Sequence, residues 1–336
     1  MKIVFIYPFL VDPYGGERHL AKLTSTLAEM GHKVYVVTLR TAKPVNDMMS
    51  KKVVIKSLDL KLSKNLFRRT FKSTTEAKAL AKRAARIKAK FYCGMGWQTT
   101  IALNSLSKDF GIKKSKLIYY CLEPPRFLHD LKKEQNSLVR FVSPLLRNRD
   151  YKNVRNLKNI IANSQWTKDQ IRNIYNLDVP VIVPGIEKKR FDKYDKEKLR
   201  KELDFPERTK VYITTSKLHK RKGIDKAISY FSRNAKGLEH FYIIGDGPEK
   251  AKLKKLAKHS RLANNIHFLG RLKDRQVEKY IKASDIFIFT AKNEPYGIAP
   301  REAVYAGLEV KPNKVLGPIL SWEGSTKKFV KYLESL

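Results

Sequence analysis

Short runs of β-branched and aromatic residues alternate with longer helical patterns along this chain, and that alternation constrains the fold most. A strand, a helix and a second strand form the unit from which parallel sheets are built. Helical patterns occupy, for example, residues 19–30, 248–259 and 275–283. We expect strands at residues 2–7, 33–38, 52–58, 89–93, 117–121 and 159–162, and again at 211–215, 240–244, 266–269 and 285–290.

The length of 336 residues suits two domains of about 150 residues each better than one. We predict an α/β protein with two Rossmann-like domains that face each other across a cleft, with ligands at the carboxyl ends of the strands. Residues 1–177 are expected to form the first domain and residues 178–320 the second. Residues 321–336 are expected to form a terminal helix that packs back on the first domain.

The formal net charge of +38 is the most unusual bulk property. A field of that size attracts anions such as nucleic acid, lipid headgroups or phosphorylated substrates, and a solvated lysine-rich surface is the alternative. The 42% of hydrophobic residues can form packed cores, which excludes a disordered chain. Cys93 and Cys121 provide neither a disulfide framework nor a zinc-binding spacing, so a cytoplasmic compartment is expected.

Any membrane contact is expected to be peripheral, because no apolar stretch approaches the roughly 18–20 residues that span a bilayer. The apolar run at residues 3–11 is interpreted as a buried first strand, since the turn after it lacks a cleavage pattern.

Residues 61–90 carry eleven Lys or Arg and a single acid, Glu76. This segment fits either an interfacial helix on anionic lipid or a core-facing helix with a solvated basic back. The sequence leaves both interpretations open. The apolar positions that recur at helical spacing are Leu80, Ala84, Ile87 and Phe91.

The sharpest local signal follows the strand expected at residues 285–290. A turn containing Gly297 leads into a helix expected to start near Pro300, with Glu294 before the turn and Glu302 one turn into the helix. Free backbone N–H groups at a helix N-terminus favour a diphosphate. Two flanking carboxylates can accept hydrogen bonds from sugar hydroxyls. The candidates for binding such a ligand are Tyr296, Gly297, Ile298 and Glu302.

In this setting Glu294 and Glu302 resemble the Glu-x7-Glu motif of family 4 retaining glycosyltransferases, which have the GT-B fold. Further segments are similar to that family in the same order across most of the chain. The resemblance implies that Glu294 is catalytic. Gly15 and Gly16 resemble the start of the family's first helix, where the lack of a side chain lets the backbone approach a phosphate closely.

A second pair of candidates follows the strand expected at 211–215. Lys217 and Lys222 match the spacing of the family's basic pair, usually Arg and then Lys. Two cations near the β-phosphate would stabilise the departing nucleoside diphosphate in the transition state. Gly245, after the next strand, is interpreted chiefly as a turn former that also contacts the nucleotide.

Residues 119–127 resemble the family's acceptor-side loop, but Leu122 stands where many relatives have a histidine. The remaining polar candidates are Glu123 as a catalytic group and His129 as a substrate-binding group. Arg126 either faces the donor phosphate or pairs with Glu123, and both readings stay open.

A second departure from the family follows Gly307. Residues 308–317 are short and unlike the family's usual continuation, which indicates that part of the second domain is trimmed.

The sequence therefore predicts a retaining hexosyltransferase that moves a sugar from a UDP- or GDP-sugar to a glycan or lipid-linked acceptor. No cofactor or metal is expected, since Asp-x-Asp is absent and the lysines and backbone amides would handle the phosphates. Peripheral contact with the inner face of an anionic membrane is an open expectation. The alternatives are a catalytically decayed nucleotide-sugar binder and a basic nucleic-acid-binding protein, for which no recognised motif is present.

Overall fold

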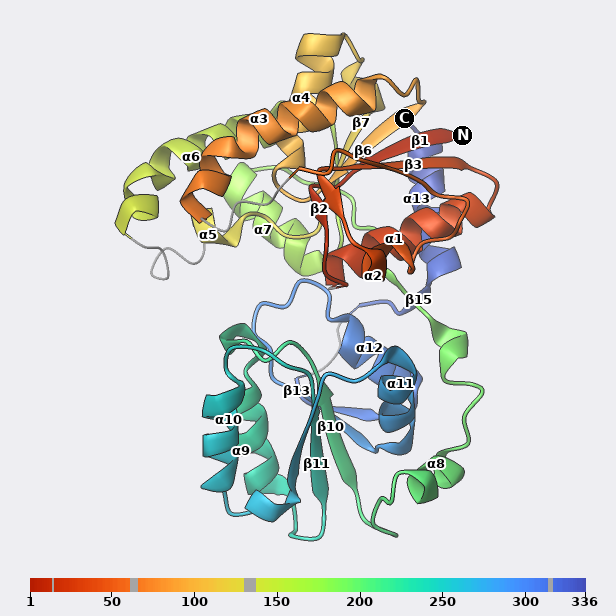
Figure 1. Cartoon of the computed structure of the whole chain (residues 1–336), viewed down its shortest axis with the longest axis vertical. Helices are drawn as coiled ribbons and strands as arrows, with labels where there is room; N and C mark the ends of the chain where they lie inside the picture. Colours follow the sequence, from red (N-terminus) through yellow and green to blue (C-terminus); the bar gives the residue numbers. More distant parts are fainter. Residues whose placement is uncertain (14, 61–65, 130–136, 314–316) are drawn as a thin grey trace. The chain divides into compact units, whose positions relative to one another are not determined.

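The computed structural model describes residues 1–13, 15–60, 66–129, 137–313 and 317–336. The chain packs into two compact units, whose elements are labelled in Figure 1. Unit 1 comprises Met1–Gly185 together with Trp322–Leu336, and unit 2 comprises Ile186–Ser321. The chain thus leaves unit 1 after Gly185 and returns to it after Ser321, whereas the sequence suggested boundaries at 177/178 and 320/321.

Unit 1 is built on a six-stranded parallel sheet with the order β5-β3-β1-β6-β7-β8. Among these strands in chain order this is 3-2-1-4-5-6, the arrangement of doubly wound dinucleotide-binding folds. The strand order reverses between β1 and β6. The strands are β1 (Lys2–Ile6), β3 (Lys33–Thr38), β5 (Val54–Ser57), β6 (Phe91–Met95), β7 (Leu117–Cys121) and β8 (Asn159–Ala162).

Helices cover both faces of this sheet, which explains why its strands are continuous apolar runs. In Figure 1, α1 (Gly15–Glu29) and α13 (Trp322–Glu334) lie together on one face, and α3 and α4 lie together on the other. The further elements of unit 1 are β2 (Phe9–Leu10), β4 (Arg40–Thr41), α2 (Lys43–Asn46), α3 (Leu66–Ala85), α4 (Thr99–Phe110), α5 (Arg126–His129), α6 (Ser137–Arg155) and α7 (Gln165–Tyr175).

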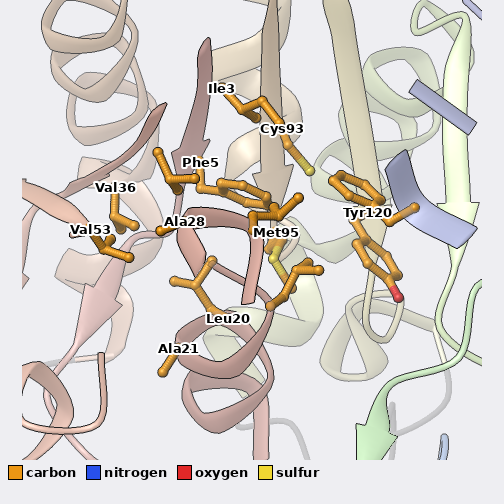
Figure 2. Packing of buried hydrophobic residues seen from close by; sticks show 14 of the residues in the cluster. Ile3, Phe5, Leu20, Ala21, Ala28, Val36, Val53, Cys93, Met95 and Tyr120 are labelled. Atoms are coloured by element: carbon orange, nitrogen blue, oxygen red, sulfur yellow. The ribbon is translucent and has the colours of Figure 1, made fainter. Parts of the chain in front are cut away.

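One core of unit 1 lies between the sheet and α1, as Figure 2 shows. Phe5 of β1 and Leu20 of α1 are completely buried in it. Phe329 of α13 belongs to the same core, with its ring centroid 6.0 Å from that of Phe5 and 5.9 Å from that of Tyr120. The terminal helix is therefore part of the core of unit 1.

α3 lies within the basic segment 61–90, whose first five residues fall outside the described part of the chain. Leu80 and Ala84 are completely buried in a core that includes Leu103 of α4. The apolar face thus packs inside the unit, which favours the core-facing interpretation over an interfacial helix. The expectation that Phe91 extends this helical face was wrong, because Phe91 pairs with Ile3 in the sheet.

Unit 2 repeats the architecture with a five-stranded parallel sheet, ordered β12-β11-β10-β13-β14. The order reverses between β10 and β13. The prediction of an α/β fold with two Rossmann-like, parallel-stranded domains is confirmed. The strands are β10 (Val211–Thr215), β11 (His240–Ile244), β12 (Ile266–Gly270), β13 (Ile286–Phe289) and β14 (Glu309–Pro312).

Two cores lie on opposite faces of the second sheet. One contains apolar residues of α9 and α10, and the other contains residues of α11 and α12. The helices of unit 2 are α8 (Lys196–Glu202), α9 (Ile224–Asn234), α10 (Lys250–Lys258), α11 (Asp274–Ala283) and α12 (Ile298–Tyr305); the short strands β9 (Gly185–Ile186) and β15 (Leu320–Ser321) lie where the chain changes unit.

β14 is a strand that the sequence did not predict. It falls in the segment 308–317 that looked unlike the family pattern, of which residues 314–316 lie outside the described part. Val310 packs against the core with α12, while Glu309 and Lys311 form an exposed ion pair of 2.8 Å. Polar and apolar residues alternate along this strand, so its sequence resembles that of a polar loop.

Among the helices of the described residues, none combines the length and the apolar character that crossing a membrane requires.

Candidate functional site

Most of the candidate residues follow the carboxyl ends of strands in one of the two sheets. In open α/β sheets, ligands bind outside these ends, where the strand order reverses. In unit 2 the reversal lies between β10 and β13, and the two segments predicted to handle the donor follow these two strands. The topology therefore explains why residues about seventy positions apart meet within one unit.

The loops after β10 and β11 are in close backbone contact. Ser216 donates its backbone N–H to Ile244 at 3.0 Å, and a Cβ at Gly245 would lie only 1.8 Å from the Ser216 carbonyl oxygen. Gly245 also has a φ of +136°, a backbone conformation that residues other than glycine rarely adopt. Its interpretation as a turn former is supported, and its contact with a nucleotide stays a prediction.

Lys222 and Glu294, both predicted to be catalytic, are direct neighbours. Lys222 Nζ donates to Glu294 Oε2 at 2.7 Å, and the two side chains are 24% and 21% exposed. Asn293, just before Glu294, has a φ of +53°, a left-handed conformation that asparagine tolerates better than most residues. Thr290 Oγ1 donates to the Gly223 carbonyl at 2.8 Å, which ties the end of β13 to the loop that carries Lys222.

The turn before α12 is held from inside the helix. Gly297 has a φ of +68° and precedes the first helical residue, Ile298. Arg301, which is buried, donates through Nη1 to the carbonyl oxygens of Tyr296 and Gly297. Its guanidinium carbon lies 3.8 Å from the centre of the Tyr296 ring. The backbone N–H groups at the start of α12 are thereby presented by a fixed turn.

Glu302 has a partner that the sequence did not suggest. Arg190 Nη2 donates to Glu302 Oε2 at 3.1 Å, and both side chains are nearly buried, at 13% and 14% exposure. Arg190 Nε also lies 4.0 Å from Glu278 Oε1. Arg190 sits in a lysine-rich stretch with no motif around it, so no sequence signal pointed to this contact.

Lys217 is exposed in the loop after β10. Unit 2 thus brings Lys222 and Glu294 together and places Tyr296, Gly297 and Ile298 at the start of α12. The roles given to these residues stay predictions.

In unit 1, Gly15 and Gly16 begin α1, directly beyond β1 and β2. A Cβ at Gly16 would lie 2.6 Å from the Tyr7 hydroxyl and 3.3 Å from Leu122 Cδ1, whereas a Cβ at Gly15 would meet nothing within 4 Å. Packing therefore already favours glycine at position 16, and its close approach to a phosphate stays a prediction. At Gly15, in contrast, the backbone is open to a ligand.

Glu17, in the first turn of α1, was not among the predicted residues. The pKa of its carboxyl group is raised, because burial outweighs the opposite effect of a hydrogen bond with the Tyr7 hydroxyl. Burial, together with Glu17, raises the pKa of Tyr7. Glu17 and Tyr7 thus form a partly buried hydrogen-bonded pair beside the two glycines. The adjacent Gly15-Gly16 turn could have drawn attention to Glu17, but a glycine pair does not indicate that the next side chain is buried.

Arg126 Nη1 lies 3.4 Å from Glu123 Oε1, and its guanidinium carbon is 5.8 Å from the centre of a Trp166 ring. Of the two readings of Arg126, pairing with Glu123 is the one seen in this structure. Glu123 lies in the loop that follows β7 and carries Leu122, and Arg126 is the first residue of α5.

His129 ends α5 and points to a buried carboxylate. Its Nε2 lies 3.1 Å from Asp150 Oδ2, and the Tyr175 hydroxyl donates to the same oxygen at 2.6 Å. Asp150 is 4% exposed, and these two side chains give its buried carboxyl group hydrogen-bond partners. His129 is thus held in one orientation on the side of α5 that faces α6 and α7.

In the stretches of chain that the structure describes, no cluster of three or more side chains could hold a metal ion.

Two sequence profiles match this chain. One, described as "Glycosyltransferase Family 4", matches residues 13–190, and the other, "Glycosyl transferases group 1", matches residues 195–310. The first match covers more than half of the 336 residues. The chain belongs to glycosyltransferase family 4. The family inferred from the Glu-x7-Glu motif is confirmed, and this family 4 member resembles other glycosyltransferases in both halves.

Curated relatives match a limited part of their own length. The N-acetyl-alpha-D-glucosaminyl L-malate synthase of Bacillus anthracis is 25% identical over 143 residues, which are 42% of this chain and 37% of the relative. The alpha-monoglucosyldiacylglycerol synthase of Acholeplasma laidlawii is 28% identical over 158 residues, 45% of this chain and 40% of the relative. The chain therefore spans about two fifths of the length of these relatives.

Among solved structures, Anabaena Alr3699/HepE in complex with UDP and glucose has a TM-score of 0.69 with 17% identity. The match covers 100% of this chain and 89% of that one. At this identity the likeness establishes the fold, which is that of GT-B glycosyltransferases.

Proposed function

We propose that this protein is a retaining, metal-independent glycosyltransferase that moves a hexose from a UDP- or GDP-sugar to a glycan or lipid-linked acceptor. The observation that carries the proposal is the contact of Lys222 Nζ with Glu294 Oε2, 2.7 Å, at the point where the sheet of unit 2 reverses its order. Next to it, the fixed turn at Gly297 presents backbone N–H groups of α12.

Each group has a role in the proposed reaction. An ammonium group has three donors, so Lys222 can hold Glu294 and a β-phosphate oxygen together. The N–H groups at the start of α12 add hydrogen bonds and the favourable end of the helix dipole. Glu294 and Glu302 accept hydrogen bonds from sugar hydroxyls, with Glu302 held by Arg190. Lys222 and the N–H groups of α12 stabilise the negative charge that develops on the leaving diphosphate in the transition state.

The reaction follows a front-face course. The bond between the sugar C1 and the β-phosphate oxygen breaks, an acceptor oxygen bonds to C1 on the same face, and the acceptor proton passes to the departing phosphate oxygen. No protein base is required at Leu122, because the leaving phosphate takes the proton. Glu123 follows Leu122 in sequence, and Glu17 follows Gly16, at which a Cβ would lie 3.3 Å from Leu122 Cδ1.

The net charge of +38 favours an acceptor that carries phosphate or sits at an anionic surface. One relative is named as a synthase of a glucosylated diacylglycerol, and a lipid acceptor would place the reaction at a membrane surface. We therefore propose peripheral contact with the inner face of an anionic membrane and a cytoplasmic location. Nucleic-acid binding has no comparable support, since the sequence carries no recognised nucleic-acid-binding motif.

The proposal is tested first on the donor. A panel of UDP- and GDP-sugars is screened by thermal shift, because a ligand that binds only the folded state raises the melting temperature. Hydrolysis or transfer is then followed with and without EDTA, and the anomeric configuration of the product is read by NMR. Loss of activity in EDTA would refute metal independence, an inverted product would refute the front-face course, and the absence of any donor binding would refute the function.

A further inference from the structure

A groove of about 470 Å³ lies on unit 1 between α6 and α7, beside the end of α5. Volumes of this size are typical of pockets for small molecules. None of the residues proposed for the donor in unit 2 lines it. The polar side chains that line it are His129, Arg147, Asn148, Tyr151, Gln170 and Asn173.

Helices α6 and α7 each contribute a pair of polar side chains to the lining of the groove. Residues three apart on a helix lie on the same face. Asn148 and Tyr151 form such a pair on α6, and Gln170 and Asn173 form one on α7. Asn148 and Asn173 are exposed and Tyr151 is 38% exposed, so these pairs form the open, polar surface of the groove.

The three amide side chains are unused. Asn148, Gln170 and Asn173 make no hydrogen bond with any residue that the structure describes, whereas Asn104 and Asn159 each donate to two backbone carbonyls. An amide both donates and accepts, so it matches the hydroxyl groups of a sugar. The groove therefore offers several free hydrogen-bonding groups of one chemical kind.

Two further groups are fixed in orientation. His129 is anchored by Asp150, which is buried and also accepts from Tyr175. Tyr151 is 38% exposed, and Arg155 donates to its hydroxyl at 3.3 Å with the guanidinium carbon 5.5 Å from the ring centre. An exposed aromatic ring with a fixed polar neighbour suits the apolar face and the hydroxyl edge of a sugar ring.

The low charge of the groove favours an uncharged sugar over a phosphate as its ligand. Lys and Arg account for 70 of the 336 residues, yet Arg147 is the one such residue that lines the groove, and Arg155 beside it is bonded to Tyr151. An anion site on this protein would be expected to use several of its many cations. A hydroxyl-rich, uncharged ligand therefore fits better.

We propose that this groove binds a sugar unit of the acceptor, so that unit 1 recognises the glycan that the enzyme extends. This inference rests on the proposed function, because it assigns the groove to the acceptor of the same transfer. Asn148, Gln170 and Asn173 would bind the hydroxyls, and Tyr151 would contact the ring.

The test uses the full chain and the methyl α-glycosides of glucose, galactose, mannose and N-acetylglucosamine as probes. Saturation-transfer NMR with the wild-type protein identifies a sugar that binds and gives its Kd. Gln170→Ala combined with Asn173→Ala is expected to weaken that Kd at least tenfold, and Asn173→Trp, which fills the groove, is expected to abolish binding. Gln165→Ala, on the same helix but bonded to Asp169, is the control and should leave Kd unchanged.

Binding of UDP, measured by thermal shift, keeps this inference apart from the proposed function. A wild-type chain that is stabilised by UDP but binds no glycoside, or that binds one equally well after Asn173→Trp, would overturn the acceptor groove alone. A chain stabilised by no nucleotide or nucleotide sugar would overturn the proposed function. Perturbation of the His129 ring signals by inorganic phosphate but by no glycoside would identify an anion site and would also overturn the inference.

Discussion

Replacing Lys222 by methionine tests the contact on which the proposed function depends. The substitution keeps the length of the side chain and removes its charge, so Glu294 loses a partner at 2.7 Å. Hydrogen bonds between charged groups contribute about 1.5–3 kcal/mol to stability. Because the two side chains are 24% and 21% exposed, water replaces part of the lost interaction, and we expect a cost of about 1–2 kcal/mol.

The effect on turnover should be larger than the effect on stability. In the ground state Lys222 pairs with Glu294, but in the proposed transition state it also faces the charge that develops on the diphosphate. Removing one preorganised donor of this kind typically lowers kcat by roughly 10²–10³-fold. We therefore expect K222M to lose about two to three orders of magnitude in kcat/KM for the donor while remaining folded.

The measurement is a double-mutant cycle with Lys222→Met, Glu294→Gln and the double variant, read by urea unfolding and by donor turnover. Lys220→Met is the matched control, since Lys220 is exposed in the same short helix. We expect a coupling free energy of about 1 kcal/mol in unfolding for the first pair. The reasoning would be refuted if the two single variants were additive in stability, or if K222M retained as much activity as the Lys220 control.

Three further predictions concern stability. Gly245→Ala should destabilise unit 2 by well over the ~1–2 kcal/mol of a left-handed backbone, because the new Cβ would lie 1.8 Å from the Ser216 carbonyl oxygen. Gly237→Ala is the control for the backbone cost, since Gly237 has a φ of +104° and open space around it. Equal losses of stability in thermal unfolding would contradict the close contact at Gly245. Burial lowers the pKa of His19 to about 3, so the folded chain keeps it neutral while the unfolded chain protonates it near pH 6.5. The stability that this adds is full above about pH 6.5 and falls by about 1.4 kcal/mol per unit as the pH drops towards 3; His19→Gln should remove that part of the slope in urea unfolding at different pH values, and the exposed His219→Gln should not. Leu80→Ala should cost about 2–4 kcal/mol, because the side chain is completely buried; unchanged stability together with weaker binding to anionic vesicles would instead support an interfacial role for α3.

Much of the fold could be predicted because its strands are buried on both faces. Leu117–Cys121, Asn159–Ala162, Val211–Thr215 and His240–Ile244 have the predicted bounds, since each is a short apolar run between polar segments. The order of strands and helices was sufficient to indicate two Rossmann-like units. β14 was missed for the converse reason: Glu309 and Lys311 face solvent, so the strand reads as a loop.

The candidate site could be predicted only as far as local patterns reach. The strand, turn and helix around Gly297 are consecutive in sequence, and their geometry follows from residue types. The pairing of Arg190 with Glu302 joins residues 112 positions apart, and no spacing or composition near Arg190 indicates it. The burial of Glu17 likewise depends on Tyr7, whose position is set by β1 and the neighbouring strands. Tertiary contacts of this kind need coordinates.

α13 has a consequence for how the chain matures. Phe329 and Leu333 complete the core beside β1, yet they follow the whole of unit 2 in the chain. A nascent chain that has already released Ile186–Ser321 still lacks this part of its first core. The second unit can therefore finish folding before the first, and a premature stop codon after Ser321 would leave Phe5 and Tyr120 without Phe329.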